Sequence, residues 1–415
     1  MADVSTKNYF YLNRDGAWPG FARSGLELCA DGSLQLLSLP RLRGILPDAV
    51  KTAPVPDGPA GIAIDATGTI YFSDPDDDRV QRILGCDGKV IAAPCMGGAS
   101  GQATSFYTPR GLLISPTRSS MFVVDSGNHR ILVFDLDTFQ LVEIWGQSSL
   151  YSAPQPGSQP GQFNTPWTLA NDSAGNIYVV DYGNLRVQKF NAIGDVVPTF
   201  CNNVQASGCH HPSDVAVCEQ NGAAWIFVMD ASVAAIFLFD ANGNPVLDSQ
   251  GQPTKISDCH LQQPMGMVAD GQSLYVGDNS AKGVLRFDID DGFKYVGEAI
   301  GYAGPVAALL LDEKGGLWVH PGGALALVPL DAQKGYGASG SVWLRKGSPV
   351  QVDDCKVVWH RLQALAKPLS AGTHLEVFAF AASDLAQAPA VDPTAENPFA
   401  DPKWQSVPYL SLIHI

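Results

Sequence analysis

The sequence predicts an all-β protein, a six-bladed β-propeller followed by a partial β-sandwich segment. Of 415 residues, 46% are apolar, 16% are charged, 42 are Gly and 29 are Pro, a composition typical of a turn-rich β protein. One pattern recurs six times: a Pro, a Gly or small residue, an apolar strand, a turn and a second apolar strand. The second strand ends in Asp in five copies, and these Asp residues step by 51, 56, 49 and 48 residues. That period is close to one four-stranded propeller blade.

Each repeat begins with a proline, here called the leading proline, and continues with three predicted strands. The leading prolines are Pro59, Pro109, Pro166, Pro212, Pro264 and Pro305. The predicted first strands are residues 61–65, 111–115, 168–172, 214–218, 266–270 and 307–311, and the second strands are 70–74, 121–125, 177–181, 226–230, 274–278 and 317–321. Third strands are predicted at 79–83, 130–134, 186–190, 235–239 and 283–287. One blade cannot bury both of its apolar faces, whereas six blades closed in a ring can.

The segments on either side of the repeats have different patterns. Residues 25–37 are typical of a two-stranded hairpin around Asp31-Gly32, and we expect it to pack at the ring closure and to supply outer strands. After Leu330 the repeat stops, and a Gly-rich stretch precedes strands that alternate apolar and polar residues. The predicted parts are an N-terminal hairpin at 1–40, the propeller at 41–333, a linker at 334–340 and a C-terminal β-sandwich segment at 341–415.

Two of the blade turns carry a family resemblance. Asp125-Ser-Gly-Asn-His-Arg-Ile131 and Asp181-Tyr-Gly-Asn-Leu-Arg-Val187, each after an apolar strand, resemble NHL repeats, and the similarity covers roughly residues 55 to 330. The resemblance implies a six-bladed propeller. It implies no single function, because propellers of this family serve as enzymes, RNA binders and scaffolds.

The C-terminal segment carries a second resemblance. Its motifs are Trp359-His-Arg-Leu362, Gly372-Thr-His-Leu-Glu-Val377, Ala382-Ser-Asp384 and Lys403-Trp-Gln-Ser406. Together they resemble a segment of phage-tail-like proteins in which an NHL propeller precedes a β-sandwich. The resemblance implies a component of a contractile, virion-like particle, with tail or baseplate proteins as partners. Such proteins continue beyond the Trp-Gln segment, so we expect the sandwich to be truncated here.

The charge and the apolar runs exclude several classes of partner. A net charge of −15 and a pI near 4.8 repel phosphate backbones and anionic lipid, so nucleic acid is not an expected partner. No apolar run approaches the ~18 residues that a membrane span requires. The first residues lack the basic and apolar regions of a signal peptide, which predicts cytoplasmic synthesis. The eight cysteines are scattered, and we interpret them mostly as reduced thiols.

The recurring Asp residues are interpreted as structural turn anchors. A carboxylate at a strand end accepts N–H bonds from the turn, and in the first three blades it can also pair with the Arg five residues later. The predicted anchors are Asp74, Asp125, Asp181, Asp230 and Asp278, with Arg79, Arg130 and Arg186 as partners. The alternative is a ring of carboxylates that binds a cation, and the structural interpretation is favoured because ordinary ion pairs place carboxylates in the same way.

Two clusters have side chains that metals accept. Asp76-Asp77-Asp78 could offer oxygen ligands to Ca²⁺, but it lacks the spaced acidic loop with a distal Glu, which favours a solvated turn. The second cluster could offer thiolates and imidazoles to Zn²⁺; its members are Cys201, Cys209, His210, His211 and Cys218. Cys209 occupies a position that is Phe or Leu in other repeats, so it is expected to fill an apolar pocket, with a loop disulfide or free thiols as the favoured states.

No catalytic set is apparent in the repeats. A propeller enzyme needs acid–base groups or metal ligands that converge on the channel, and the histidines at 129, 260 and 320 share no common position in the repeat. The long polar loops before the third blade, with Trp145 and Tyr151 as their aromatic residues and continuing through residues 154–161, are a candidate contact site for protein or glycan, with an ordinary surface loop as the alternative. We therefore expect a non-enzymatic module that binds protein or surface glycan, with no cofactor. The alternative is a propeller hydrolase or lyase with a metal site in the central channel.

Overall fold

The computed structural model describes residues 38–84, 89–97, 105–115, 119–146, 155–220, 222–248, 250–312, 315–323 and 325–336, together with six short strands outside these ranges. The chain divides into two compact units. One comprises residues 38–335, and the other joins residues 1–37 to residues 336–415. Helices in the described part of the chain are all too short or too polar to cross a bilayer.

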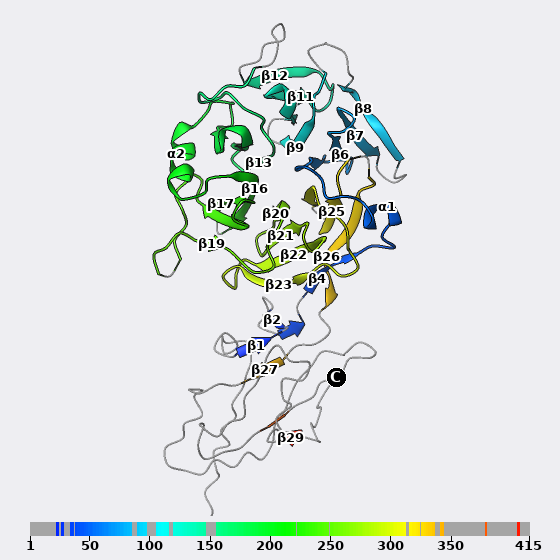
Figure 1. Cartoon of the computed structure of the whole chain (residues 1–415), viewed down its shortest axis with the longest axis vertical. Coiled ribbons are helices and arrows are strands. Elements are labelled where there is room, and N and C mark those ends of the chain that lie inside the picture. Colours follow the sequence, from blue (N-terminus) through cyan, green and yellow to red (C-terminus); the bar gives the residue numbers. More distant parts are fainter. Residues whose placement is uncertain are drawn as a thin grey trace, which may run out of the picture. The chain divides into compact units, whose positions relative to one another are not determined.

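The larger unit consists of six antiparallel sheets that follow one another around a common centre (Figure 1). The six-bladed propeller predicted from the repeats is confirmed. The first blade is β5 (Ile62–Ile64), β6 (Ile70–Asp74), β7 (Arg79–Leu84) and β8 (Lys89–Gly97), and the second is β9 (Pro109–Ser115), β10 (Ser120–Asp125), β11 (Arg130–Asp135) and β12 (Leu141–Gly146). The third is β13 (Leu169–Asn171), β14 (Ile177–Asp181) and β15 (Arg186–Phe190).

The remaining blades repeat the same order of strands. The fourth is β16 (Pro212–Gln220), β17 (Ala223–Asp230), β18 (Ala235–Phe239) and β19 (Lys255–Ile256), and the fifth is β20 (Pro264–Ala269), β21 (Ser273–Asp278), β22 (Gly283–Asp288) and β23 (Lys294–Glu298). The sixth is β24 (Ala308–Leu311), β25 (Gly316–His320), β26 (Val328–Tyr336) and β4 (Ser38–Leu42). Short helical segments are α1 (Asp48–Lys51), η3 (Ser126–Asn128), η4 (Tyr182–Asn184) and α2 (Pro198–Ala206).

A helix follows the three strands of the third blade, where the blade pattern predicted a fourth strand. α2 begins with Pro198, a residue that suits the first turn of a helix because its missing N–H would be unpaired there anyway. Phe200 and Val204, four residues apart on one helix face, are both buried and pack with Tyr178 of β14. The apolar face of the helix thus covers the blade edge.

The core lies between neighbouring blades, and the second strand of a blade serves both neighbours. Every residue of β10 is buried. Met121 and Val123 pack toward Tyr71 of the first blade, whereas Phe122 and Val124 pack toward Val179 of the third. Successive side chains of a strand point to opposite faces, which explains why this strand reads as one continuous apolar run.

Three sets of contacts complete the sixth blade and join it to the fifth and first blades. β4 pairs with β26 as the outermost strand of the last blade, and the blue and yellow strands lie together in Figure 1. The buried Arg286 of β22 donates from Nη1 to the Ser38 carbonyl of β4. His320 of β25 donates from Nε2 to the Ser73 carbonyl of β6 (2.9 Å) and accepts from the Gly322 N–H at Nδ1 (3.1 Å).

The second unit is described by its strands alone. β2 (Leu26–Leu28) pairs with β3 (Leu34–Leu36), and β1 (Ala22–Ser24) pairs with β27 (Ser341–Trp343). β28 (Phe378–Ala379) pairs with β29 (Gln405–Ser406). Residues 334–336 of the predicted linker form the end of β26, and apart from these residues and the strands above, the predicted linker and β-sandwich segment lie outside the described residues. The expected packing of the N-terminal hairpin on the propeller stays a prediction.

Candidate functional site at the mouth of the central channel

The central channel is lined by the first strand of every blade and is almost closed. Its lining includes Gly61, Gly111, Thr168, Asp214, Gly266 and Ala307, one from each blade. The free volume is about 70 Å³. A Cβ atom on Gly61 would lie 2.3 Å from the backbone oxygen of Arg110 and from the nitrogen of Leu112, so the first two blades meet backbone to backbone. This free volume is less than a quarter of that of the pocket beside the channel.

A larger pocket opens beside the channel and shares Asp214 and Gly266 with it. Its volume is about 310 Å³, at the lower end of the range of small-ligand sites. The third, fourth and fifth blades supply most of the lining. It consists of Pro59, Trp167, Tyr182, His211, Ser213, Asp214, Met229, Ala231, Ser232, Pro264, Met265 and Gly266. We call this space the channel-mouth pocket.

Asp214 is the one carboxylate of the channel-mouth pocket. It is 7% exposed, and it accepts the N–H of Val215 at Oδ1 (2.8 Å) and the N–H of Met267 at Oδ2 (2.9 Å). Thr168 Oγ1 is buried and makes no well-formed hydrogen bond within the described residues, although its hydroxyl favours the charged form of Asp214. Burial dominates these interactions and raises the pKa of Asp214 to about 6. No Lys or Arg among the described residues pairs with this carboxyl.

An aromatic pair forms one wall of the pocket. The rings of Trp167 and Tyr182 stack with their centroids 3.4 Å apart and an interplanar angle of 7°. The guanidinium of Arg110 lies 5.5 Å from the Trp167 ring centre and donates from Nη1 to the Pro59 carbonyl (3.0 Å). Burial lowers the pKa of Arg110. The pocket therefore combines a rigid aromatic wall with a single acidic group.

The five recurring Asp carboxylates lie outside this pocket and are all buried. In four blades they accept the N–H of the residue two positions before the leading proline. These donors are Tyr107 to Asp125 (2.7 Å), Asn164 to Asp181 (2.7 Å), His210 to Asp230 (3.0 Å) and Gln262 to Asp278 (2.7 Å). The sequence pattern pointed to donors in the following turn and did not reveal this link to the loop before the blade. The stabilising role of these carboxylates stays a prediction.

Arginine partners occur in the first three blades. Arg79 Nη2 lies 2.9 Å from Asp74, Arg130 Nε lies 2.7 Å from Asp125, and Arg186 Nε lies 2.8 Å from Asp181. Burial raises the pKa of Asp125 and Asp181, and the hydrogen bonds to these carboxylates offset part of that rise. The carboxylates of Asp125 and Asp181 thus accept donors at both oxygens, whereas Oδ1 of Asp74 is buried and has no hydrogen-bond partner among the described residues.

The acidic turn of the first blade is also engaged by protein groups. Asp77 Oδ2 lies 2.6 Å from Arg79 Nη2, and Asp78 Oδ1 accepts the N–H of Thr108 (2.7 Å). His129 occupies the equivalent place in the second blade, where its Nδ1 accepts the N–H of Thr165 (3.0 Å). These contacts tie each turn to the loop that begins the next blade.

The zinc candidates of the fourth repeat do not meet in one group among the described residues. Cys201 lies on α2, and Cys209 and Cys218 are buried in two different core clusters. Burial raises the pKa of Cys209 to about 12 and that of Cys218 to about 11, which disfavours the thiolate that zinc requires. All three are free thiols, and Cys209 fills an apolar pocket as expected. His210 and His211 are exposed, and only His211 lines the channel-mouth pocket.

Of the two residues named for the candidate contact loop, only Trp145 lies in the described part of the chain. Trp145 is the penultimate residue of β12 and is 8% exposed. Its ring stacks on Phe190 of β15 at 4.6 Å, and Nε1 donates to Glu143 (2.8 Å). Trp145 thus fills the core between two blades instead of standing in an exposed loop, because the neighbouring blade offers an aromatic surface. Tyr151 lies outside the described residues.

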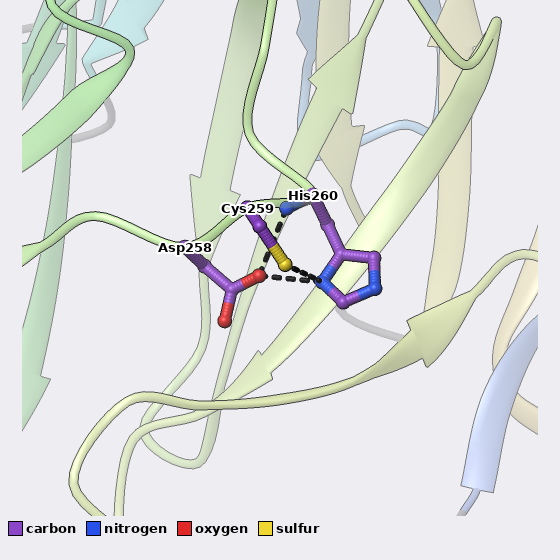
Figure 2. Close-up of side chains that lie close together, drawn as sticks. All are labelled: Asp258, Cys259 and His260. Atoms are coloured by element: carbon purple, nitrogen blue, oxygen red, sulfur yellow. Dashed lines mark hydrogen bonds and ion pairs between the residues drawn. The ribbon is translucent and has the colours of Figure 1, made fainter. Parts of the chain in front are cut away.

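One group of three metal-ligating side chains does meet, on the loop before the fifth blade. Figure 2 shows Asp258, Cys259 and His260 pointing toward one another. This run was not predicted as a metal site from the sequence, because three consecutive residues match none of the usual zinc spacings.

Comparisons with known proteins agree with the repeat pattern. Residues 56–200 match the family described as SMP-30/gluconolactonase/LRE-like region. Human NHL repeat-containing protein 3 is 30% identical over 105 residues, which are 25% of this chain and 27% of that protein. The predicted resemblance to NHL-repeat propellers is confirmed over part of the chain. This propeller chain spans about a quarter of the curated relative it matches, and nothing in the match concerns phage tails.

Solved propeller structures are similar at low sequence identity. A regucalcin from Agrobacterium tumefaciens, described as a calcium-binding protein, is 13% identical with a TM-score of 0.45, over 72% of this chain and 96% of that one. A gluconolactonase from Xanthomonas campestris is 15% identical with a TM-score of 0.42, over 71% and 96% of the two chains. Likeness at this level assigns no activity or ligand to the NHL-type propeller described here.

Proposed function

We propose that the protein is a non-enzymatic binding module whose channel-mouth pocket receives a Lys or Arg side chain of a partner protein. The observation that carries this proposal is a pocket of about 310 Å³ with one buried carboxyl, Asp214, that lacks a cationic partner among the described residues. An unpaired buried carboxylate is costly, and a cation brought by a partner would offset that cost.

The shape and chemistry of the pocket support a long cationic side chain. Pro59, Met229, Pro264 and Met265 contribute apolar walls, along which the aliphatic stem of Lys or Arg can pack. The formal net charge of −15 also attracts a basic partner. A sugar would find little open aromatic surface to bind, because the Trp167 ring is already covered by Tyr182 and approached by Arg110. The partner is therefore proposed to be a protein with an exposed basic side chain.

The test uses the full chain on arrays of Lys- and Arg-containing peptides and on a glycan array. Ala231→Trp fills the pocket, and Val233→Trp, an exposed position of the same turn that does not line it, is the matched control. We expect Ala231→Trp to abolish peptide binding and Val233→Trp to retain it. Equal binding by both variants would refute the pocket. Binding to glycans with no binding to peptides would replace the proposed ligand class.

The pH dependence of binding gives an independent readout. Because burial raises the pKa of Asp214 to about 6, the carboxylate is charged at pH 7.5 and becomes protonated at pH 5. Peptide affinity should fall below pH 6, approaching tenfold per pH unit once the carboxyl titrates. An affinity that stays constant from pH 7.5 to pH 5 would exclude a charge interaction with Asp214.

A role in a phage-tail-like particle is part of this proposal and is supported only by the sequence resemblance of residues 359–406. In that role the protein would be synthesised in the cytoplasm and joined to the particle through its C-terminal segment. The neighbouring genes provide the test. Genes for tail sheath, tube or baseplate proteins would support the particle role, and a neighbourhood of metabolic enzymes would remove it.

A second candidate function is hydrolysis or elimination at the same pocket. Asp214, with its raised pKa, and the exposed His211 line one space, and such a pair suits general acid–base catalysis. The match of residues 56–200 to a family whose description includes gluconolactonase makes lactones the first substrates to assay. Turnover that is lost in His211→Ala and kept in His210→Ala would favour the enzyme over the binding module.

A further inference from the structure

We propose that Asp258, Cys259 and His260 form a three-ligand site for a zinc-class divalent metal ion on the loop before the fifth blade. This site is separate from the channel-mouth pocket and does not depend on the function proposed for it. One carboxylate oxygen, one sulfur and one imidazole nitrogen lie within 4.8 Å of one another. Figure 2 shows the three side chains facing a common space from one turn of the chain.

The distances between the donor atoms suit a tetrahedral ion. Cys259 Sγ lies 3.6 Å from His260 Nδ1. With Zn–S near 2.3 Å and Zn–N near 2.0–2.1 Å, sulfur and nitrogen on one tetrahedral ion lie about 3.6 Å apart. Asp258 Oδ1 lies 2.5 Å from the same nitrogen, whereas two tetrahedral ligands would lie about 3.3 Å apart. Binding thus requires Oδ1 and Nδ1 to move apart by about 0.8 Å and the proton between them to leave.

The arrangement does not suit a catalytic Cys–His–Asp relay. In such a relay the two imidazole nitrogens have separate partners, one the nucleophile and the other the carboxylate. Here Nδ1 of His260 faces both Cys259 and Asp258. Convergence of three donors on one point is instead what a metal ion requires.

The turn and a neighbouring ring hold the ligands in place. Asp258 Oδ1 also accepts the His260 N–H (2.9 Å), and the Asp258 carbonyl accepts the N–H of Leu261 (3.0 Å). Leu261 is buried in the core and anchors the turn. The His260 ring stacks on Tyr295 of β23, with centroids 3.8 Å apart and an interplanar angle of 10°. Ligands that are ordered before binding lose less entropy when the ion arrives.

The donor set selects the class of metal. A thiolate together with an imidazole favours Zn²⁺ and related borderline ions, whereas Ca²⁺ and Mg²⁺ take oxygen ligands. Cys259 and His260 are exposed, so an ion can enter from solvent and keep a fourth position for water. Binding releases the thiol proton of Cys259, and the His260 proton moves to Nε2 or to solvent. Affinity should therefore increase with pH.

The test titrates the full chain with Co²⁺ and with Zn²⁺ under reducing conditions. Co²⁺ bound by Cys259 gives a thiolate-to-cobalt charge-transfer band, and Zn²⁺ should displace it at about one equivalent per chain. We expect the band to be lost in Cys259→Ser and the Zn²⁺ affinity to fall by at least about tenfold in Cys259→Ser and in His260→Gln. His210→Ala, an exposed histidine on the corresponding loop of the fourth blade, is the matched control and should leave both unchanged.

Thermal unfolding of each apo variant checks that the exposed substitutions leave the fold intact. No charge-transfer band in the parent chain, or a band that persists in Cys259→Ser, would overturn the proposal. Loss of the charge-transfer band in Cys259→Ser together with an unchanged Zn²⁺ affinity in His260→Gln would mean that the ion is bound through the thiol alone. This result would also overturn the proposal.

Discussion

Asp125 offers a test of how the blades are held together. Its carboxylate accepts the N–H of Tyr107, the side-chain amide of Asn128 and Nε of Arg130. The side chain of Arg130 is only 5% exposed, and its Nη2 donates to the Ser105 carbonyl (3.1 Å). Asp125→Ala would leave a nearly buried cation without its carboxylate. Removing one member of a buried ion pair costs about 3–5 kcal/mol.

Asp181 is the comparison that makes the reasoning quantitative. Arg186 keeps three carbonyl acceptors when Asp181 is removed, those of Ser158, Gln159 and Gln162. The Asn164 N–H is then the main donor that loses its partner. One orphaned N–H costs about 1–3 kcal/mol. We therefore expect Asp125→Ala to destabilise the propeller more than Asp181→Ala does.

Urea and thermal unfolding of the two variants measure this order, with the exposed Asp137→Ala as a control from the same blade. For a unit of this size, 3 kcal/mol corresponds to a fall of about 5 °C in Tm. A double variant of Asp125→Ala with Arg130→Met should recover part of the loss, because it removes the unpaired cation. If Asp125→Ala unfolds like Asp137→Ala, the buried ion pair contributes nothing. Unchanged stability with lost binding would make Asp125 a functional residue.

Two further predictions concern pH and packing. Burial lowers the pKa of His129 and His320 below the ordinary 6.5, so the unfolded chain binds protons first and the free energy of unfolding should fall as pH drops from 7 to 5. The fall is up to about 1.4 kcal/mol per pH unit for the buried His320 and smaller for the half-buried His129, because solvent screens its charge. Asp214, with its raised pKa, makes the free energy of unfolding change with pH in the opposite direction. Urea unfolding at pH 7 and at pH 5 is therefore compared between the parent and His129→Gln. An equal change in the free energy of unfolding in both proteins would contradict the lowered pKa of His129. Gly61→Ala should lower the free energy of unfolding by about 1–3 kcal/mol, since its Cβ would lie 2.3 Å from backbone atoms. Gly271→Ala is the control and should not lower it, because no atom lies nearer than 3.7 Å to the added Cβ. Equal Tm values for the two variants would show that the first two blades can move apart.

The propeller could be predicted because its signals are local. The second strands predicted at 70–74 and 177–181 coincide with β6 and β14, since a strand buried on both faces is a continuous apolar run bounded by turns. α2 was missed although Pro198 is a helix-start signal, because the repeat pattern led to the expectation of a fourth strand.

The candidate sites depend on the ring and could not be predicted in the same way. Asp214 was placed on a first strand, but only the meeting of six blades brings it to the channel. Trp145 looked exposed because its partner Phe190 lies 45 residues away on the next blade. The run from Asp258 to His260 was overlooked because consecutive side chains of an extended chain diverge, and a tight turn is needed to bring their donors together.

The closing strand β4 also constrains how this chain can fold during its synthesis. β4 leaves the ribosome roughly 290 residues before its partner β26, a delay of about 15 to 60 s at ordinary rates of translation. During that time the strand has no sheet to join, and the sixth blade, once made, has a bare edge until β4 arrives. Such edges recruit strands from other chains. Crowded synthesis should therefore favour exchange of β4 between molecules, and slower translation of the last blade should lengthen the period of exposure.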